Sequence, residues 1–460
     1  MTQHEAPFFD ALARFAEGDD VMFSTPGHKR GVGLDESSRR LFGAALAVDV
    51  PHGGGADTPH FSLGLLRAAE RLAAEAHGAD DARFLVNGST AGNLAMLLAT
   101  CVDGDEVIIT RMLHKSLLAG LVFSGARPVY VKPELHADHN LPLDTPPAAV
   151  AAALEAHPRA KAVVLVSPSY VGVTSDLTGI VEVCRSAGVP LLIDEAWGPH
   201  LHFHPDLPPS AMEAGADASV SSDHKMLGAL TQGSTLLMRR GLLDIDRVHT
   251  VVDMVQTTSP SVLIFASLDA GRRQMALHGE DLLTRTIELA GRVREAIAEI
   301  DGLYAVGPEI LAGRPGAGFD PTRIMLDVHG LGLTGYDAER ILREEHGVRV
   351  EMSDLLSVLF LITIGDDERS IGRLIDGIRS LAGHRRAGRI EVQWRSTGEL
   401  LFAGEPELTP REAFAAEVEI VAPEAAAGRI SAESITPYPP GIPIVTPGER
   451  IRPEVIDYLR

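Results

Sequence analysis

From about residue 76 to residue 240, short β-branched runs alternate with Ala/Leu-rich stretches, and this alternation restricts the chain to few folds. The runs are RFLV, EVIIT, RPVYV, AVVLVSP, PLLIDEA, ASVSS and STLLM. Strands that alternate with helices predict βαβ units and a mostly parallel sheet. The runs do not alternate strictly between polar and apolar residues, which is typical of strands covered on both faces. The sequence therefore predicts an α/β domain whose sheet is covered by helices.

The rest of the chain differs in texture, and a chain of 460 residues is expected to form two or three domains. The first part is rich in Gly, Pro and His, which predicts ordered loops or arms. A long helical stretch and a strand-helix-strand-strand-helix pattern follow the large domain and predict a smaller α/β domain. The predicted division is an N-terminal arm (1–75), a large domain (76–265), a connector helix with a small α/β domain (266–385) and a C-terminal segment (386–460).

Composition excludes several classes of function. The formal net charge is −22, which argues against a nucleic-acid partner because phosphate contacts need clustered Lys and Arg. The two cysteines, Cys101 and Cys184, do not suggest a disulfide framework. The N-terminus lacks the pattern of a secretory signal, and no apolar run is long enough to span a bilayer. We expect a soluble, cytoplasmic protein with no membrane partner.

Three features within the large domain each follow a predicted strand. In VNGSTAGN, Gly88, Ser89 and Thr90 would open a helix and offer N–H groups and hydroxyls to an anion, although the P-loop pattern is absent. In PLLIDEAWG, Asp194 lies at the carboxyl end of a strand, the edge at which open α/β sheets bind ligands. Each feature alone also fits a simple helix cap.

The third feature is ASVSSDHKMLGALTQGS, in which Ser222, His224 and Lys225 follow a strand. The chain has two other His-Lys pairs, His28-Lys29 and His114-Lys115, and a single lysine is usually a solvated surface charge. A phosphate-anchoring loop, then an aspartate, then a lysine is the order of a pyridoxal-phosphate (PLP) site. The phosphate needs donors, the pyridine nitrogen needs an anion, and the aldehyde needs an amine for its Schiff base.

A metal site is the weaker alternative for this region. Three histidines follow Asp194 closely, but their spacing does not match a recognised ligand set. They are His200, His202 and His204. The prediction is therefore a PLP site with no metal.

The sequence resembles the bacterial ornithine/lysine/arginine decarboxylases, PLP-dependent enzymes of the aspartate-aminotransferase fold (fold type I). The resemblance begins near residue 20 and rests on TPGHKRG, FLVNGSTAGNLAML, HKSLLAGLVFSGARPVYV, SPSYVGVTSDL, LLIDEAWGPH, HKMLGALTQGS, GLGLTGYDAERIL and YPPGIPIVTPGE, among other motifs. It implies a short form without an N-terminal wing domain. It also implies decarboxylation of lysine, ornithine or arginine to an amine and CO2, an amine that enters polyamine biosynthesis. Sites in this fold usually lie at a subunit interface, so a homodimer or higher homo-oligomer is expected.

The resemblance also implies a role for each site residue. Lys225 would carry the cofactor, Asp194 would pair with the pyridine nitrogen, and His114 would stack on the ring. Trp197 would lie near the cofactor. The TPGHKRG arm would help to shape the active-site cleft, including the cleft of a neighbouring subunit. The phosphate would be held by Gly88, Ser89, Thr90, Ser222 and His224. The group that returns a proton to Cα, either His224 or Lys225, stays open.

Two positions depart from the family pattern. Asp223 stands where members usually have a small hydroxyl residue, and we expect its carboxylate to point away from the phosphate. Leu356-Ser357 replaces a common Tyr-Asn pair, which leaves the substrate preference open. Glu351 and Asp354 are candidate partners for the distal cation of the substrate, although surface or capping roles are favoured for both.

Other reactions and roles remain open from the sequence. The same residues support transamination, elimination or oxidative deamination, because substrate orientation decides which bond breaks. A transaminase would be expected to bind the substrate carboxylate with an arginine, and the sequence has no clear motif for one. Arg273 and Arg323 are the candidates. A non-catalytic partner protein is the third reading, disfavoured by the intact PLP residues. In the proline-rich C-terminal segment, Tyr438 and Glu449 are candidate site residues.

Overall fold

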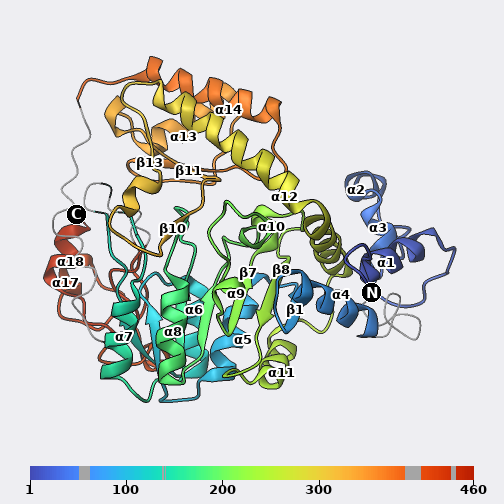
Figure 1. The fold of residues 1–460 in the computed structure, drawn as a ribbon, viewed down its shortest axis with the longest axis horizontal. Helices are drawn as coiled ribbons and strands as arrows, with labels where there is room; N and C mark the ends of the chain where they lie inside the picture. The colour runs from blue at the N-terminus through green and yellow to red at the C-terminus, as the bar shows by residue number, and fades with distance from the viewer. Residues whose placement is uncertain (51–62, 137–138, 140, 389–405, 437–441, 460) are drawn as a thin grey trace.

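The computed structural model describes residues 1–50, 63–136, 139, 141–388, 406–436 and 442–459. A seven-stranded sheet forms the large domain, and a smaller domain lies above it in Figure 1. The helix α12 (Val262–Ala298) runs diagonally between the two domains. The predicted connector helix is therefore present.

The large sheet is mostly parallel, as predicted. Its order is β1 (Asp81–Leu85), β8 (Ser234–Met238), β7 (Ala218–Ser221), β6 (Leu191–Asp194), β4 (Val163–Val166), β2 (Glu106–Thr110) and β3 (Arg127–Val131). Only β8 runs against its neighbours, since both of its pairings are antiparallel while β7, β6, β4, β2 and β3 pair in parallel. The parallel strands bring their carboxyl ends, and the loops that follow them, to one edge.

Helices cover both faces of this sheet. Along β2, Val107 and Ile109 pack into one apolar cluster and Ile108 into the other, because successive side chains of a strand alternate between its faces. The first cluster includes side chains of α5 (Gly88–Thr100), α6 (Lys115–Ser124) and α11 (Ile245–Val255). The second includes side chains of α1 (Pro7–Glu17), α4 (Leu63–Ala76), α7 (Pro147–Ala156), α8 (Leu177–Ala187), α9 (Ala211–Ala214) and α12. The absence of strict alternation in the sequence is thus explained by burial on both faces.

The small domain has the predicted strand-helix-strand-strand-helix order. Its sheet runs β12 (Met352–Ser353), β13 (Ser357–Leu361), β11 (Arg323–Asp327) and β9 (Tyr304–Ala305), and it packs with α13 (Gly335–His346) and α14 (Glu368–Leu381). A two-residue pairing of β10 (Gly318–Phe319) with β5 (Val173–Thr174) joins the segment before β11 to a loop of the large domain. This pairing brings the start of β11 close to the carboxyl edge of the large sheet.

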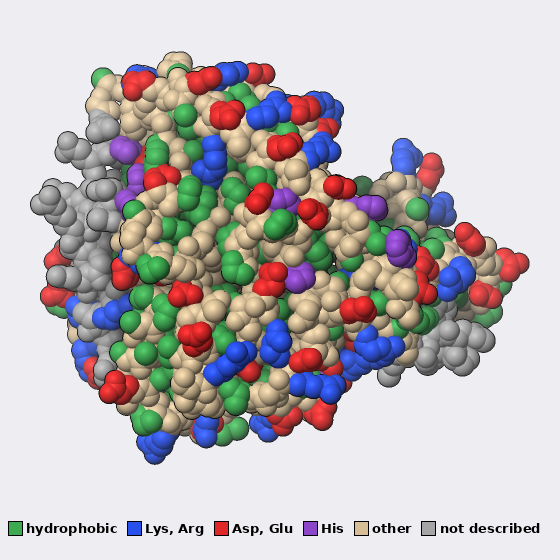
Figure 2. Space-filling model, viewed as in Figure 1, with side chains coloured by type: hydrophobic (Ala, Val, Ile, Leu, Met, Phe, Trp, Pro, Cys, Tyr) green, Lys and Arg blue, Asp and Glu red, His purple; other side chains and the backbone are tan. Residues whose placement is uncertain are grey.

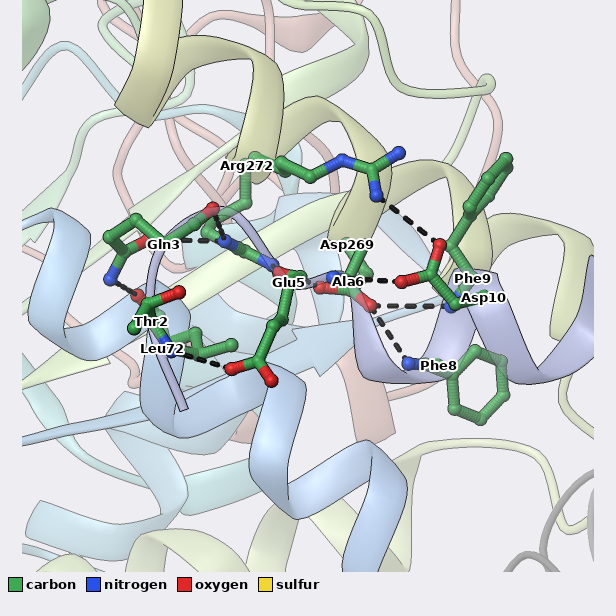
Figure 3. A network of polar contacts seen from close by, with 11 residues as sticks. Thr2, Gln3, Glu5, Ala6, Phe8, Phe9, Asp10, Leu72, Asp269 and Arg272 are labelled. Atoms are coloured by element: carbon green, nitrogen blue, oxygen red, sulfur yellow. Dashed lines mark hydrogen bonds and ion pairs between the residues drawn. The ribbon is translucent and has the colours of Figure 1, made fainter.

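The N-terminal part is more helical than predicted. Besides α1 and α4 it contains α2 (Glu36–Phe42) and α3 (Ala45–Val48), so loops are confined to the Gly/Pro-rich runs. Figure 3 shows how its start is fixed to α12: Asp269 Oδ2 accepts hydrogen bonds from the N–H groups of Phe8 (2.9 Å) and Phe9 (3.2 Å). Arg272 pairs with Asp269 and donates to the carbonyls of Gln3 and Glu5. The sequence of the arm alone could not predict how the chain start and α1 are held, because their partners lie more than 250 residues away.

The C-terminal segment folds back onto the edge of the large sheet. It includes α16 (Pro410–Ala415), α17 (Pro423–Ala426) and α18 (Pro453–Tyr458), and Figure 1 shows α17 and α18 beside the large domain. Arg111, just after β2, makes two hydrogen bonds to Glu449 at 2.5 and 2.7 Å, and all of these groups are buried. The predicted division at residues 75, 265 and 385 stays a prediction, and α4 and α12 cross the first two positions.

No helix among the described residues is long and apolar enough to cross a membrane. On the face drawn in Figure 2, Asp and Glu side chains are interspersed with Lys and Arg rather than gathered into one patch. The net negative charge is therefore spread over this face.

Candidate active site

The carboxylate of Asp194 lies at the centre of the site, at the carboxyl end of β6. It is buried, and its Oδ2 accepts a hydrogen bond from Asn93 Nδ2 on α5 at 2.7 Å. Its Oδ1 accepts one from the N–H of Ala196 at 3.1 Å, within a turn and not at the start of a helix, so the alternative that Asp194 caps the next helix is wrong. Glu195, the next residue, turns to the other side and accepts from the N–H of Ala211. Of these two neighbouring carboxylates, that of Asp194 therefore faces the site.

A hydrogen-bond chain connects Asp194 to the His114 ring. Asn93 Nδ2 also donates to Ser116 Oγ at 2.9 Å, and Ser116 Oγ lies 2.7 Å from His114 Nδ1. Ser116 N–H donates to the same Nδ1, which marks Nδ1 as the acceptor and leaves the ring proton on Nε2. Burial lowers the pKa of His114, while the Asp194 carboxylate opposes this shift. The ring is therefore held in one orientation beside the carboxylate.

The start of α5 lies against the end of β7. Gly88 adopts a positive φ of 71° in the turn into the helix, and its N–H donates to the carbonyl of Gln232. Gly92 allows the helix to approach the sheet, since a Cβ there would lie 2.4 Å from Val220 Cγ2. As a result Ser222 Oγ donates to Ser89 Oγ at 3.0 Å. Free N–H groups of a first helical turn together with two hydroxyls suit an anionic oxygen group.

Thr90 lies in the same first turn of α5 and is half-buried. The structure therefore brings Ser89, Thr90 and Ser222 together at the end of the helix. His224 is less directly engaged, because its Nδ1 bonds to the carbonyl of Gly233 at 2.8 Å. Since a carbonyl only accepts, Nδ1 carries a proton and Nε2 is the atom left for another partner.

Lys225 lies in the short helix α10 (Asp223–Met226), and its amine faces the indole of Trp197. The Nζ atom is 3.5 Å from the ring centroid, a cation–π geometry. Burial lowers the pKa of Lys225 to about 8, Asp194 and Glu351 oppose that shift, and Arg323 adds to it. The amine is thus more readily deprotonated than that of an ordinary lysine, as a nucleophilic amine requires.

Asp223 turns toward β8, where its carboxylate accepts hydrogen bonds from Ser221 Oγ (2.8 Å) and Thr235 Oγ1 (2.6 Å). Burial raises the pKa of Asp223 to about 6, against the lowering effect of these two hydroxyls. Both oxygens thus have partners away from Ser89, in agreement with the expected orientation.

The other His-Lys pairs have different surroundings. Lys29 donates to the carbonyl of Ser24 within the N-terminal arm. Lys115 is exposed at the start of α6, although it lies near enough to lower the pKa of His114. Lys225, by contrast, is half-buried over the Trp197 ring, and the Asp194 carboxylate is among the charges that affect its pKa.

The metal alternative finds no support in the described part of the chain, which contains no group of three or more His, Cys, Asp or Glu side chains able to hold a metal ion. His200 bonds to Asp320 (3.0 Å), His202 pairs with Glu213 (3.4 Å) and His204 bonds to Thr284 (2.9 Å). The three side chains thus have separate partners.

Several other candidates have structural partners. Asp354 Oδ1 accepts from the N–H groups of Leu356 and Ser357, the favoured capping role. Arg273 pairs with Asp10 at 3.2 Å, and Glu449 pairs with Arg111 in place of a site contact. Tyr438 lies outside the described residues. Glu351 is exposed and lies near enough to Lys225 to affect its pKa.

Sequence reasoning missed three residues around the site: Asn93, Ser116 and Arg323 as a neighbour of Trp197. Asn93 and Ser116 both lie within motifs that resemble the family, so their polarity inside an apolar helix was the available signal. Arg323 gave no such signal, because its partners lie about 100 or more residues away.

The sequence is similar to that of a known enzyme family along most of its length. The family profile described as Orn/Lys/Arg decarboxylase, major domain, matches residues 6–370, and the corresponding C-terminal domain matches residues 398–460. The chain is 43% identical to an arginine decarboxylase of Halalkalibacterium halodurans over 100% of this chain and 93% of that protein. It is 42% identical to the arginine decarboxylase of Bacillus subtilis over 100% of this chain and 94% of that protein.

Solved structures support the fold alone. The lysine decarboxylase of Francisella novicida superposes with a TM-score of 0.81 at 21% identity, over 99% of this chain and 76% of that one. An alanine–glyoxylate aminotransferase of Nostoc superposes with a TM-score of 0.57 at 20% identity, over 72% of this chain and 89% of that one. The predicted fold class is therefore confirmed, and the profiles and sequence relatives show that the chain is an amino acid decarboxylase that belongs to the Orn/Lys/Arg decarboxylase family.

Proposed function

We propose that the protein decarboxylates L-arginine to agmatine and CO2 with PLP bound covalently at Lys225. The observation that carries the proposal is the convergence of a buried carboxylate, Asp194, and a half-buried amine, Lys225, beside a helix N-terminus lined with hydroxyls. Arginine is proposed over lysine and ornithine because the relatives at 43% and 42% identity are named arginine decarboxylases.

The residues present fit PLP. Asp194 has one amide donor and one backbone donor but no ion pair with a cation among the described residues, so a pyridinium N–H would supply the missing charge partner. Ser89, Thr90 and Ser222, with the first N–H groups of α5, would hold the phosphate. His114 would contact the face of the ring, and Gly88 and Trp197 would border the cofactor.

When bound, PLP supplies an electron sink for the pair released as the Cα–carboxylate bond breaks. The protein's part is to keep that sink protonated and oriented. Asn93 fixes Asp194 and, through Ser116, the His114 ring, so the carboxylate and the ring cannot reorient independently. Lys225 supplies the amine for cofactor attachment, and either Lys225 or His224 Nε2 returns the proton to Cα.

Glu351 is the proposed partner of the substrate guanidinium. Glu351 is exposed, unlike Asp354, whose carboxylate accepts capping hydrogen bonds. The Glu351 charge opposes the burial that lowers the pKa of both Lys225 and Arg323, so it lies near both. A carboxylate can accept two parallel hydrogen bonds from a guanidinium, a geometry that an ammonium cannot reproduce.

The test is to incubate PLP-loaded protein separately with arginine, lysine and ornithine and to identify the products by mass spectrometry. Agmatine from arginine is expected, and Glu351→Gln should raise the KM for arginine about 10-fold or more because a charged hydrogen bond is lost. Cadaverine or putrescine as the main product would reassign the substrate. A keto acid without CO2 would contradict decarboxylation.

We also propose that the protein is a homodimer whose N-terminal arm contacts the neighbouring subunit. Large apolar side chains of the arm are unusually exposed: Phe23 (95%), Val21 (79%), Val32 (78%) and Leu41 (79%). Apolar groups gathered on one exposed segment are typical of an interaction surface. The same arm includes the TPGHKRG motif, which would then lie near the partner's cleft.

A further inference from the structure

Arg323, the first residue of β11, reaches from the small domain into the site of the large domain. Its side chain is fully buried, and Nη2 donates to the carbonyl of Trp197. Nη1 contacts Met226 Sδ at 3.1 Å, one residue beyond Lys225. The guanidinium carbon also lies 5.1 Å from the centre of the Trp197 ring, and the Lys225 amine lies 3.5 Å from the same centre. One side chain therefore contacts both segments that surround Lys225.

A buried carboxylate fixes the guanidinium in this position. Asp320 Oδ2 lies 3.3 Å from Arg323 Nε and 3.0 Å from His200 Nε2, and Asp320 Oδ1 accepts from the N–H and hydroxyl of Thr322. Burial alone would raise the pKa of Asp320, but His200 and Arg323 hold it well below its usual range. Asp320 therefore stays charged and connects the small-domain arginine to a large-domain histidine.

The Arg323 side chain packs closely against Gly172, where a larger residue would collide with it. A Cβ at Gly172 would lie 2.9 Å from Arg323 Cγ, and Gly172 has a positive φ of 100°. The carbonyl of Gly172 accepts from the N–H of Asp320 at 2.8 Å, next to the β5–β10 pairing. The loop of the large domain thus leaves room for this one connection.

We propose that Arg323 is a positioning residue that couples the placement of the small domain to the geometry of Trp197 and Lys225, an inference that rests on the proposed role of Lys225 as the cofactor lysine. Two of its donor groups are committed to the Trp197 carbonyl and Met226 Sδ, which distinguishes it from an arginine that clamps a substrate carboxylate. Its charge acts in the same direction as burial on the pKa of Lys225 and so favours the neutral amine.

Two variants separate charge from position. Arg323→Gln removes the cation and the contacts, whereas Arg323→Lys keeps the cation but cannot reach both partners. The matched control is Arg294→Gln: Arg294 is another arginine of this region, and it donates to the carbonyls of Val306 and Arg323 without contacting Trp197 or Met226.

The first readout is free of cofactor and turnover. Each apoprotein is treated with an amine-selective acylating reagent across a pH series, and modification of Lys225 is followed by peptide mass spectrometry. The parent should show a midpoint near its pKa of about 8. Arg323→Gln should raise the midpoint, Arg323→Lys should leave it near that of the parent, and Arg294→Gln should not change it.

The second readout is steady-state kinetics of the PLP-loaded proteins with arginine. Both Arg323 variants should lower kcat about 100-fold with KM changed less than about 3-fold, because the reacting groups are misplaced rather than the substrate unbound. An unchanged Lys225 midpoint in Arg323→Gln, the same losses in Arg294→Gln, or a rise in KM alone would each overturn the inference. Failure of the parent itself to attach PLP at Lys225 would instead overturn the proposed function.

Discussion

At the scale of single residues, the site depends on a few polar atoms that are shared. Asn93 is the clearest case, since its one amide nitrogen donates to both Asp194 and Ser116. A residue shared in this way fixes a carboxylate and, through the serine, an imidazole. Removing it leaves two buried acceptors without their donor, which costs more than the bonds themselves contribute.

Asn93→Ala should therefore weaken PLP binding about 10-fold to 100-fold, since one unsatisfied buried group costs about 1–3 kcal/mol. The measurement is a titration of apoprotein with PLP followed by absorbance. Thr100→Ala is the control, because Thr100 is on the same helix and, within the described part of the chain, its hydroxyl bonds to that helix and to the adjacent Cys101. Equal affinities for the parent and Asn93→Ala would show that the asparagine does not support the site.

At the scale of elements, contact distances between helices and strands decide whether the site forms. Helix α5 must lie close to β7 for Ser89 to meet Ser222, and Gly92 permits that approach. The Asp223 carboxylate also links β7 to β8, because it accepts hydrogen bonds from Ser221 on β7 and Thr235 on β8. The Ser222–Ser89 and Thr235–Asp223 contacts depend on the packing of whole elements, whereas the Ser221–Asp223 contact is local.

Gly92→Ala should lower the free energy of unfolding by about 1–3 kcal/mol, because the new methyl group meets Val220 in a closely packed core. Gly291→Ala, in α12 with no neighbouring atom near its Cβ, should instead stabilise the protein by up to about 1 kcal/mol. Denaturant unfolding followed by circular dichroism compares the two. Equal effects of both substitutions would contradict the packing argument.

Asp223 makes stability depend on pH. Because its pKa is raised to about 6, between about pH 4 and pH 6 the folded protein keeps a proton that the unfolded chain has lost. Its contribution to stability is therefore lost as pH rises through that window. The unfolding free energy of Asp223→Asn, relative to that of the parent, should increase by about 1–3 kcal/mol from pH 4 to pH 6. A difference in unfolding free energy between Asp223→Asn and the parent that stays constant from pH 4 to pH 6 would contradict this role of Asp223.

Site residues that lie within a local motif at the end of a strand could be predicted from the sequence. Asp194 is the last residue of β6, and Lys225 lies shortly after the end of β7, so the predicted strands were enough to place both residues at the same edge of the sheet. Arg323 and the Asp269–Arg272 contacts with the N-terminus could not be predicted, because each depends on packing between segments far apart in the chain. For Asp354, the capping role that sequence reasoning had favoured is the one observed.

At the scale of the whole molecule, the small domain and the C-terminal segment both pack against the large domain. The small domain contributes Arg323, and the C-terminal segment is fixed by the buried Arg111–Glu449 pair. The N-terminal arm instead directs exposed apolar side chains away from the described core. This asymmetry is the reason to expect that the arm is completed by a second subunit.

Phe23→Glu should shift the protein from dimer toward monomer, since it places a charge in the proposed apolar interface. Size-exclusion chromatography with light scattering measures the mass. Ile420→Glu is the control, because Ile420 is as exposed as Phe23 (98%) but belongs to the C-terminal segment. A monomeric parent, or equal masses for the parent and Phe23→Glu, would contradict the assignment of the interface.

The central claim is that Lys225, rather than Lys29 or Lys115, carries the cofactor. The most direct measurement is to reduce the PLP-loaded protein with borohydride, digest it and locate the added mass by peptide mass spectrometry. The account predicts the reduced cofactor on Lys225, beside the Trp197 ring and near Asp194. Cofactor mass on Lys29 or Lys115, or on no lysine, would contradict it.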